Sequence, residues 1–455
     1  MKIVLVSDQE EATNIQSLGL GYLVSYAKKY SDDDSQFIII NKRPESSREI
    51  AKLKPDIVGF TSMSLYYTEI ERLAQEVKRE LDVPIFIGGH HISIMPESLT
   101  ENFDFAIAGE GEDTFLQLID NQFDYKNTDG IYYKDDHKLI YTGERELITP
   151  LDKIPFPDRD AMDIRKYLHN FNWVGTKKLG RGTSMITSRG CPHKCAFCSA
   201  SIFWKKYREH SAEYVVNEIE ILHEKYRCNN LLIYDDYFTA NKKRLLKIKE
   251  MLAERGLSGK IRYACLARAD RFDSETAKAL KEIGVETVNF GFESGSDKIL
   301  KYLKGPRSSV ELNQQAIDIS YENGLFVGAN IIIGNPNETP KDLEDSYNFL
   351  INNIKNLDTI LVHQATAYPR TAFWDYAKEM GIEYSIKDLD YRIKHKQVLS
   401  NIKDFDKWYN KFIELQGIKQ TKIDIPYNLE FFLFLLNRMI KNPRDTIRKI
   451  KDKIS

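Results

Sequence analysis

The chain has 455 residues, of which 42% are hydrophobic and 29% are charged, and its formal net charge is -2. This length predicts two or three domains, and the apolar content supports hydrophobic cores and excludes global disorder. The balanced charge gives no general attraction to nucleic acid, no stretch approaches the ~20 apolar residues that cross a bilayer, and the first residues lack the pattern of a signal peptide, so we expect a cytoplasmic protein without a transmembrane segment or a nucleic-acid partner.

Residues 1–150 alternate between short apolar runs and helical stretches. The apolar runs are rich in β-branched residues, which is typical of buried parallel strands. Residues 67–82 predict an amphipathic helix with its apolar residues on one face. The alternation predicts a doubly wound, Rossmann-like α/β domain, and residues 130–143 predict an added hairpin that turns at Asp135 and Asp136.

A stretch rich in proline and charge at residues 149–163 predicts a linker, which we extend over residues 151–180. The α/β alternation then restarts and predicts six strand–helix units over residues 181–370. A closed eight-stranded barrel usually needs ~250 residues, so we expect a partial (β/α)6 TIM barrel.

Residues 371–455 are predicted to form a helical C-terminal region that caps the barrel and contributes to the substrate site. Within it, residues 427–455 combine an aromatic and aliphatic run with a basic end. We expect a helix that packs its apolar face on the barrel. The alternative is an interfacial helix that makes peripheral contact with an anionic membrane.

Three of the five cysteines, Cys191, Cys195 and Cys198, fall within eight residues at the carboxyl end of the first barrel strand, where barrel folds place their active sites. In a reducing compartment this clustering indicates a metal site or catalysis rather than a disulfide. A structural zinc site needs four ligands, so zinc is the less favoured alternative. Three thiolates can instead hold three irons of a 4Fe-4S cluster and leave the fourth iron open. The other two cysteines, Cys228 and Cys265, are predicted to be buried packing residues.

The segment CPHKCAFC (191–198), with Phe197 before the third cysteine, resembles the radical S-adenosylmethionine (radical SAM) superfamily. The resemblance implies that the amino and carboxylate groups of SAM bind the open iron. It also implies that the single cluster cleaves SAM reductively to a 5'-deoxyadenosyl radical, which abstracts hydrogen from a substrate.

Later segments of the barrel resemble the same superfamily. The resemblance implies that Asp235 and Asp236 approach the amino group of SAM and that Arg268 pairs with its carboxylate, as guanidinium groups do. Capping of the following helix is the alternative role for the two aspartates, and one of them is expected to do only that.

The resemblance also implies that Glu293 and Ser294, at the strand end G-x-E-S-G, contact the ribose of SAM, and that Gly334 allows close approach of the ligand on the adenine side. Glu338 is expected to brace the Gly334 loop rather than to touch a ligand. In members of the superfamily a later segment usually reads P-G-T, and Arg370 stands at the position of its glycine in this chain. It is either a cation for a substrate anion near the barrel mouth or a surface arginine.

The first domain resembles the cobalamin-binding domain that precedes many radical SAM enzymes. Two segments after predicted strands, TSMS (61–64) and GGHH (88–91), would meet at one crevice on the carboxyl edge of the sheet. The resemblance implies hydroxyl contacts to the nucleotide base, close approach of the backbone, and a histidine that faces the ligand; the candidates are Thr61, Ser62, Ser64, Gly88, Gly89 and His90.

Two further segments of this domain, residues 108–112 and residues 7–19, bear on a helix end and on a cobalt ligand. The acids of AGEGE (108–112) are expected to favour the dipole of the next helix, which is a structural role. The loop at residues 7–19 lacks the Asp-x-His-x-x-Gly that supplies a cobalt ligand in many cobalamin proteins, and His137 is expected to be a surface residue. The resemblance therefore implies cobalamin bound without a protein histidine on cobalt, and a domain that binds no cobalamin is the alternative.

Together these resemblances imply a cobalamin-dependent radical SAM enzyme, with a 4Fe-4S cluster, SAM and cobalamin as cofactors, that methylates an unactivated carbon as class B methyltransferases do. One alternative is radical rearrangement, cyclisation or oxidation, with cobalamin as an electron carrier or absent. Another is a metal-binding regulatory protein without turnover. The expected partners are a small-molecule or peptide substrate and an electron donor such as a flavodoxin or ferredoxin.

Overall fold

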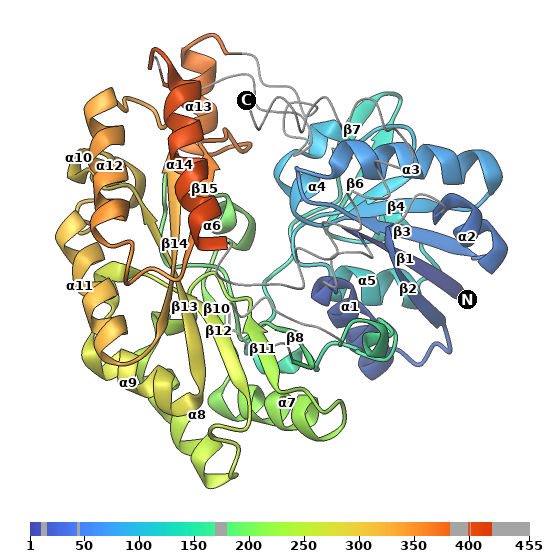
Figure 1. The fold of residues 1–455 in the computed structure, drawn as a ribbon. Helices are drawn as coiled ribbons and strands as arrows, with labels where there is room; N and C mark the ends of the chain where they lie inside the picture. Colours follow the sequence, from blue (N-terminus) through green and yellow to red (C-terminus); the bar gives the residue numbers. More distant parts are fainter. Residues whose placement is uncertain (11–15, 43–45, 169–179, 383–398, 401, 421–455) are drawn as a thin grey trace, which may run out of the picture.

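The computed structural model describes the whole chain except residues 11–15, 43–45, 169–179, 383–398, 401 and 421–455 (Figure 1). It contains two large, mainly parallel sheets, each covered by helices. The predicted terminal helix at residues 427–455 lies outside the described residues. None of the described helices combines the length and the apolar character needed to cross a membrane.

The first sheet has the strand order β2-β1-β3-β4-β5-β6-β7, and its first five strands are parallel. Its strands are β1 (Lys2–Glu10), β2 (Gln36–Lys42), β3 (Ile57–Thr61), β4 (Ile85–Gly88), β5 (Phe105–Ile107), β6 (Ile131–Asp135) and β7 (Lys138–Tyr141). Its helices are α1 (Leu18–Tyr30), α2 (Ser46–Leu53), α3 (Tyr67–Glu80), α4 (His90–Ile94) and α5 (Glu112–Asp120). This is the predicted doubly wound architecture.

Helices cover both faces of the first sheet, which explains the continuous apolar runs within its parallel strands, such as residues 3–6 of β1. Helices α2 and α3 pack on one face and helices α1 and α5 on the other, and each face has its own hydrophobic cluster. The strand order reverses between β1 and β3, so a crevice opens at their carboxyl ends. The added hairpin β6–β7 is confirmed, but its turn lies at Asp136 and His137, because these two residues adopt the positive φ angles of the turn.

The second sheet has the order β15-β14-β13-β12-β11-β8 with all strands parallel, as predicted for a partial barrel of six units. Its strands are β8 (Gly182–Met185), β11 (Asn230–Ile233), β12 (Arg262–Ala267), β13 (Val285–Glu293), β14 (Phe326–Ile333) and β15 (Thr359–Gln364). A short ribbon of β9 (Ser188–Arg189) and β10 (Arg208–Glu209) follows β8.

Helices cover the outer face of this partial barrel, where the largest hydrophobic cluster lies (Figure 1). Side-chain caps start several of these helices, such as Asp273 before α9 and the Thr339–Asp342 capping box before α12. The described helices of this half of the chain, of which α6 packs on α4 of the first domain, are α6 (Ala200–Trp204), α7 (Ala212–Glu224), α8 (Lys242–Glu254), α9 (Ser274–Ile283), α10 (Asp297–Lys304), α11 (Val310–Glu322), α12 (Pro340–Asn352), α13 (Ala372–Glu379) and α14 (Phe405–Gln420).

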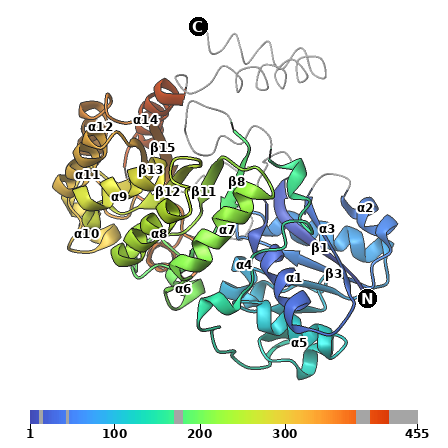
Figure 2. The ribbon, with the colours of Figure 1, turned by 90° about the horizontal axis from the view of Figure 1, so that it is seen from below.

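The described part of the connecting segment is packed against both domains. Its apolar residues Ile148, Leu151, Ile154 and Met162 form a cluster with side chains of α1. Arg159 is buried and pairs with Glu218 of α7 at 2.8 Å, and Figure 2 shows α7 at the border between the two domains. The domain boundaries at residues 150, 180 and 370 remain predictions.

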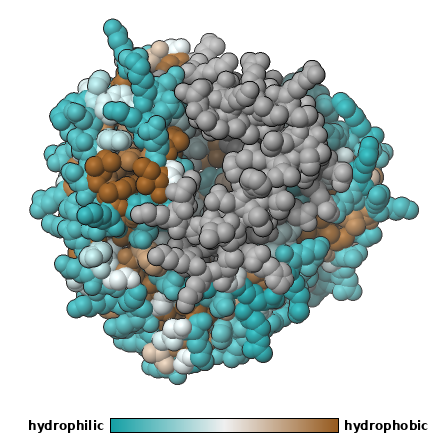
Figure 3. Space-filling model, viewed as in Figure 1, coloured by the Kyte–Doolittle hydropathy of each residue, from teal (hydrophilic) through white to brown (hydrophobic). Residues whose placement is uncertain are grey.

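The described surface on the side viewed in Figure 1 is mostly hydrophilic, with hydrophobic residues gathered in patches on the barrel side (Figure 3). Cys228 and Cys265 are fully buried in the main cluster of the barrel, which confirms that they are packing residues. His137 is a surface residue as expected, with 92% of its side chain exposed.

Candidate active site

The cysteine loop runs from Gly190 to Ser199, between the β9 strand and helix α6. Gly190 begins the loop with a φ of +82°, and a Cβ atom there would lie 2.9 Å from Cβ of Trp204. Only glycine fits this position without strain. The glycine before the first cysteine therefore turns the chain into the loop.

The middle of the loop is fixed by contacts to later parts of the barrel. The amide of Ala196 donates to the carbonyl of Leu303 at 2.8 Å, and the Ala196 carbonyl accepts from Phe373. Phe197 lies with its ring centroid 6.3 Å from that of Phe373, in an apolar cluster with α13. Phe197 thus helps to seat the loop, and its predicted contact with a cofactor remains a prediction.

The three thiols of Cys191, Cys195 and Cys198 are half-buried and close enough for their charges to interact. Burial raises the pKa of all three, and that of Cys198 to about 12. Among the described histidine, cysteine and acidic side chains, no group of three converges on a single metal ion. Three thiols on one short loop are one fewer than a structural zinc site needs and match the three protein ligands that leave one iron of a 4Fe-4S cluster open.

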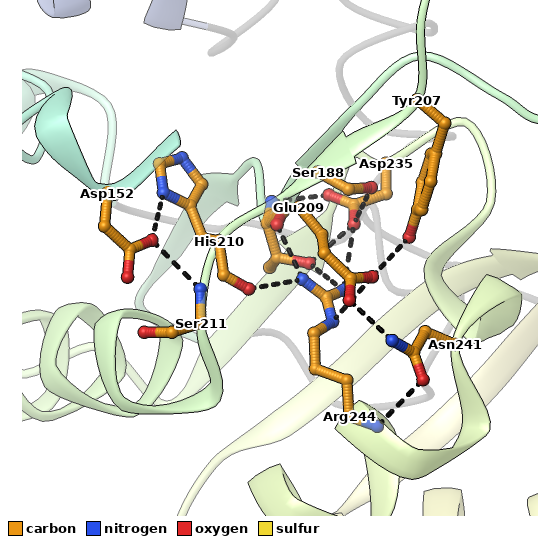
Figure 4. Close-up of polar contacts among 10 residues, drawn as sticks. Asp152, Ser188, Tyr207, Glu209, His210, Ser211, Asp235, Asn241 and Arg244 are labelled. Atoms are coloured by element: carbon orange, nitrogen blue, oxygen red, sulfur yellow. Dashed lines mark hydrogen bonds and ion pairs between the residues drawn. The ribbon is translucent and has the colours of Figure 1, made fainter. Parts of the chain in front are cut away.

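Asp235 is buried at the carboxyl end of β11 and accepts three hydrogen bonds from the segment that precedes the loop. They come from the amide and the hydroxyl of Thr187, both at 2.5 Å, and from the Ser188 hydroxyl at 2.6 Å (Figure 4). Arg244 of α8 donates to the Thr187 carbonyl at 2.7 Å and to the His210 carbonyl at 3.0 Å. Asp235 and Arg244 together brace the chain just before the cysteines.

Asp236, unlike the buried Asp235, is exposed to solvent. The protein atoms around its carboxyl group and the charge of Asp235 nevertheless raise the pKa of Asp236 to about 6. Its charge also acts on Cys191 and Cys198, so it faces the cysteine loop. The expectation that one of the two aspartates caps the next helix is wrong, because α8 is capped by Asn241, which accepts from its third residue.

Arg268 lies next to the loop, as expected, but its guanidinium is already paired. Its Nε and Nη2 atoms donate to the two carboxylate oxygens of Asp270 at 3.0 and 2.8 Å. The remaining Nη1 atom donates to Sγ of Cys195 at 3.3 Å. This pairing with Asp270 was not predicted.

Glu293 and Ser294 follow each other at the end of β13 but differ in their surroundings. Glu293 is 8% exposed and has a φ of +64°, which is unusual for a residue with a side chain. Ser294 is fully buried, and its hydroxyl lies 3.0 Å from that of Ser346. The geometry favours a structural role for Ser294, whereas Glu293 stays a candidate ligand contact.

On the adenine side, Gly334 has a φ of +82° and its amide donates to Glu338 at 2.6 Å. Glu338 also accepts from the Asn335 amide at 3.0 Å, and burial raises its pKa to about 7. It braces the loop as expected. Arg370 is exposed and lies 3.7 Å from Glu97 of the first domain, which fits the surface alternative.

In the first domain, the segments after β3 and β4 meet as predicted: Ser62 donates its amide to the Gly88 carbonyl, and the His91 amide donates to the Ser62 carbonyl. Gly89 has a φ of +93°, and a Cβ atom there would lie 2.5 Å from Oγ1 of Thr61. Thr61 and Gly88 are half-buried at this edge.

Two of the predicted hydroxyl groups are already engaged. Ser62 is buried and donates to the Met63 carbonyl at 2.8 Å. Oγ of Ser64 lies 3.0 Å from Nδ1 of His91, and burial lowers the pKa of that histidine to about 4.

The two histidines begin a short helix, α4, which directly follows Gly89. His90 is half-buried and stacks on Phe203 of α6 with ring centroids 3.9 Å apart. Burial lowers the pKa of His90 to about 4, so the imidazole is neutral near pH 7. This stacking brings the edge of the first sheet against the cysteine loop.

Two residues at this crevice were missed. Asp8 is buried near the end of β1, accepts from the Met63 amide at 2.7 Å, and has a pKa raised by burial to about 6. Tyr234 follows β11 and is 54% exposed. Burial raises its pKa, and the charge of Asp8 in the other domain adds to this shift. The rule that strand ends carry sites could have identified both.

The acids of the AGEGE segment do more than favour a helix dipole. Glu112 accepts from Arg189, which precedes the cysteine loop, at 2.5 Å, and Glu110 pairs with Arg189 at 3.4 Å and with Arg208 of β10. All four side chains are buried, at 8% exposure or less. We name Glu110, Glu112, Arg189 and Arg208 the interdomain ion cluster.

Comparisons with known proteins agree with this arrangement. Residues 185–350 match the model of the radical SAM superfamily, and residues 11–119 match that of the B12 binding domain. An uncharacterized methyltransferase of Pyrococcus horikoshii is 34% identical over 408 residues, which cover 83% of each chain. An anaerobic magnesium-protoporphyrin IX monomethyl ester cyclase of Rubrivivax gelatinosus is 28% identical over 84% of this chain and 69% of its own.

Solved structures share the fold. The radical SAM methyltransferase TsrM of Kitasatospora setae, with cobalamin and a [4Fe-4S] cluster bound, superposes with a TM-score of 0.67 at 16% identity, over 84% of this chain and 79% of that one. The cobalamin-dependent SAM radical enzyme OxsB superposes with a TM-score of 0.62 at 19% identity, over 92% of this chain and 61% of that one.

Proposed function

Since the chain belongs to the radical SAM superfamily and carries a B12-binding domain in front of its radical SAM domain, we propose that it is a cobalamin-dependent methyltransferase that acts on an unactivated carbon. The observation that carries this proposal is the meeting of the carboxyl edges of the two sheets, where His90 stacks on Phe203 at 3.9 Å. Ligands held at the two edges would face each other across one space. The name of the 34% identical relative supports the same reaction class.

The residues present fit the cofactors. Cys191, Cys195 and Cys198 would hold three irons of the 4Fe-4S cluster, with SAM beside them. At the other edge, Gly89 and Gly109 have positive φ angles, and a Cβ at Gly109 would have no atom within 4 Å, so the backbone leaves room for a ligand. When bound, the cluster supplies the electron for SAM cleavage, and cobalamin supplies a carrier for the methyl group.

The protein's own task in this reaction is to position and enclose the reactants. Asp235 and Arg244 fix the segment before the cysteines, and the interdomain ion cluster fixes that segment to the first domain. His90 and Phe203 close one side of the crevice with apolar ring faces, and His90 carries no charge there near neutral pH.

We also propose a cytoplasmic location, because clustered thiolates persist in a reducing compartment. The partners would be a small-molecule or peptide substrate and a flavodoxin or ferredoxin as the electron donor. The second candidate function is a ring-forming or oxidative radical reaction, and the 28% identical relative that is named a cyclase supports it.

Anaerobic purification after expression with iron, sulfide and cobalamin tests the proposal. We expect one corrinoid per chain beside a 4Fe-4S spectrum, and release of S-adenosylhomocysteine from SAM under reducing conditions. A cluster without corrinoid, with 5'-deoxyadenosine as the sole product of SAM, would reject methyl transfer and favour the second candidate.

A further inference from the structure

The inner face of the partial barrel carries exposed side chains. On β15, Leu361 and His363 are exposed, whereas the two residues that alternate with them are buried in the main cluster on the outer face. On β12, Leu266 is exposed in the same way, at 37%. Side chains alternate between the two faces of a strand, so these three residues point to the inner side of the sheet. Closed barrels fill this space with packed side chains, and here it is left open.

Strand pairing places a polar residue and a ligand candidate on the same face. Asn330 of β14 pairs with Leu361, and the next inward residue, Ile332, pairs with His363. On β13, a Cβ at Gly291 would collide with Oε1 of Glu293, so that carboxylate also lies on the inner side. Neighbouring strands are about 4.8 Å apart, so Glu293 and His363 are separated by roughly 10 Å. We name Leu266, Asn330, Leu361 and His363 the inner-face site.

The imidazole of His363 is held in one tautomer. Nδ2 of Asn330 donates to the Phe290 carbonyl at 3.2 Å, so Oδ1 of the same amide is the atom that lies 3.4 Å from Nε2 of His363. An amide oxygen only accepts, so Nε2 carries the hydrogen. Burial lowers the pKa of His363, and the ring is therefore neutral near pH 7. In this tautomer Nδ1 is a hydrogen-bond acceptor, and it has no partner among the described residues.

The surroundings of this acceptor carry no charge. Burial alone shifts the pKa of His363, and no charged side chain of the described residues contributes. The cations Arg268 and Lys304 act instead on Cys195, in the cysteine loop. A site of this kind suits an apolar ligand with one N–H or O–H group. It disfavours a carboxylate or a phosphate, because burying an anion without a cation is unfavourable.

We propose that the inner-face site binds the substrate, and that Nδ1 of His363 accepts a hydrogen bond from an N–H or O–H group on an uncharged, largely apolar part of it. This inference deepens the proposed function by naming the chemistry of the substrate. It rests on the radical SAM assignment and not on methyl transfer, so a failure of methylation would leave it standing.

The test uses three probes that share one apolar body. They are 2-naphthol, which has a hydroxyl donor, 2-methoxynaphthalene, which has none, and 2-naphthoate, which is an anion. Binding is measured by anaerobic equilibrium dialysis on the reconstituted full chain. We expect 2-naphthol to bind about three- to tenfold more tightly than 2-methoxynaphthalene, as for one neutral hydrogen bond, and 2-naphthoate to bind most weakly.

Two variants of His363 separate hydrogen bonding from packing. His363→Phe keeps a ring without an acceptor and should bind the two neutral probes within about twofold of each other, whereas His363→Gln keeps an acceptor oxygen and should retain a preference of about threefold for 2-naphthol. His137→Phe, the same change at a 92% exposed side chain, is the matched control and should leave the three affinities unchanged.

Three results would overturn the proposal. They are equal or absent binding of the two neutral probes to wild type, tightest binding of 2-naphthoate, and an undiminished preference for 2-naphthol in His363→Phe. Corrinoid content and the products of SAM are measured in separate assays, so a failure of the proposed function is recognised there and not by the probes.

Discussion

Replacing Asp235 with asparagine should destabilise the fold far more than the same change at Asp236. Asp235 accepts hydrogen bonds from Thr187 and Ser188 at 2.5–2.6 Å, and its carboxylate lies 3.8 Å from the buried guanidinium of Arg244. Hydrogen bonds to a charged group contribute about 1.5–3 kcal/mol each, and asparagine can keep one acceptor oxygen. With two of the three bonds weakened and Arg244 left with less compensation, we expect a loss of about 3–5 kcal/mol.

Chemical denaturation of anaerobically prepared enzyme, followed by circular dichroism, measures this loss. Asp236→Asn is the matched control, because it makes the same chemical change at the neighbouring residue. We expect it to leave the fold at least as stable as wild type at neutral pH, because the pKa of Asp236 is raised to about 6 and the native state therefore disfavours its charged form. Iron content should fall in Asp235→Asn and persist in Asp236→Asn. A loss below about 1 kcal/mol for Asp235→Asn, or a larger loss for Asp236→Asn, would refute the bracing role of Asp235.

Three further predictions concern single residues. Cys195→Ala should reduce cluster iron and lower 5'-deoxyadenosine formation to less than about a tenth of wild type, and undiminished SAM cleavage would contradict the thiol's role as a ligand. The His91 pKa is lowered by burial from 6.5 to about 4, so the native protein binds fewer protons than the unfolded chain. The stability advantage of wild type over His91→Gln should therefore be full above pH 6.5 and shrink as the pH falls to 4, by up to about 1.4 kcal/mol per pH unit in urea titrations, whereas the exposed control His137→Gln should show no such trend. Gly89→Ala should cost at least about 1 kcal/mol, because its φ is +93° and a Cβ would lie 2.5 Å from a side-chain oxygen, while Gly19→Ala, in open space on α1, should be neutral or stabilising by up to about 1 kcal/mol in the same assay.

The architecture was predictable because its signals are local. Buried parallel strands require continuous apolar runs, and the turns after them require small or polar residues. The cysteine loop was equally visible, because thiols that share a cluster must lie close in the sequence when one turn supplies them. The meeting of residues 61–64 with residues 88–91 followed from the rule that carboxyl ends of parallel strands share one edge.

The roles of individual side chains were not predictable to the same extent. Asp235 and Asp236 are identical neighbours, and their roles diverge because only Asp235 faces Thr187, 48 positions away in the chain. The pairing of Arg268 with Asp270 could have been suspected from their spacing, but its orientation toward Cys195 depends on how two strand ends meet.

The interdomain ion cluster bears on whether the two domains can exist apart. Glu110 and Glu112 belong to the first domain, and their partners Arg189 and Arg208 belong to the barrel. If one domain unfolded alone, the charges of the other would lose their partners in a largely apolar inner face, and breaking a buried ion pair costs several kcal/mol. The two domains should therefore unfold in one thermal transition. A chimaera that joins either domain to the other domain of a related protein should fold only if it also carries the matching glutamates or arginines.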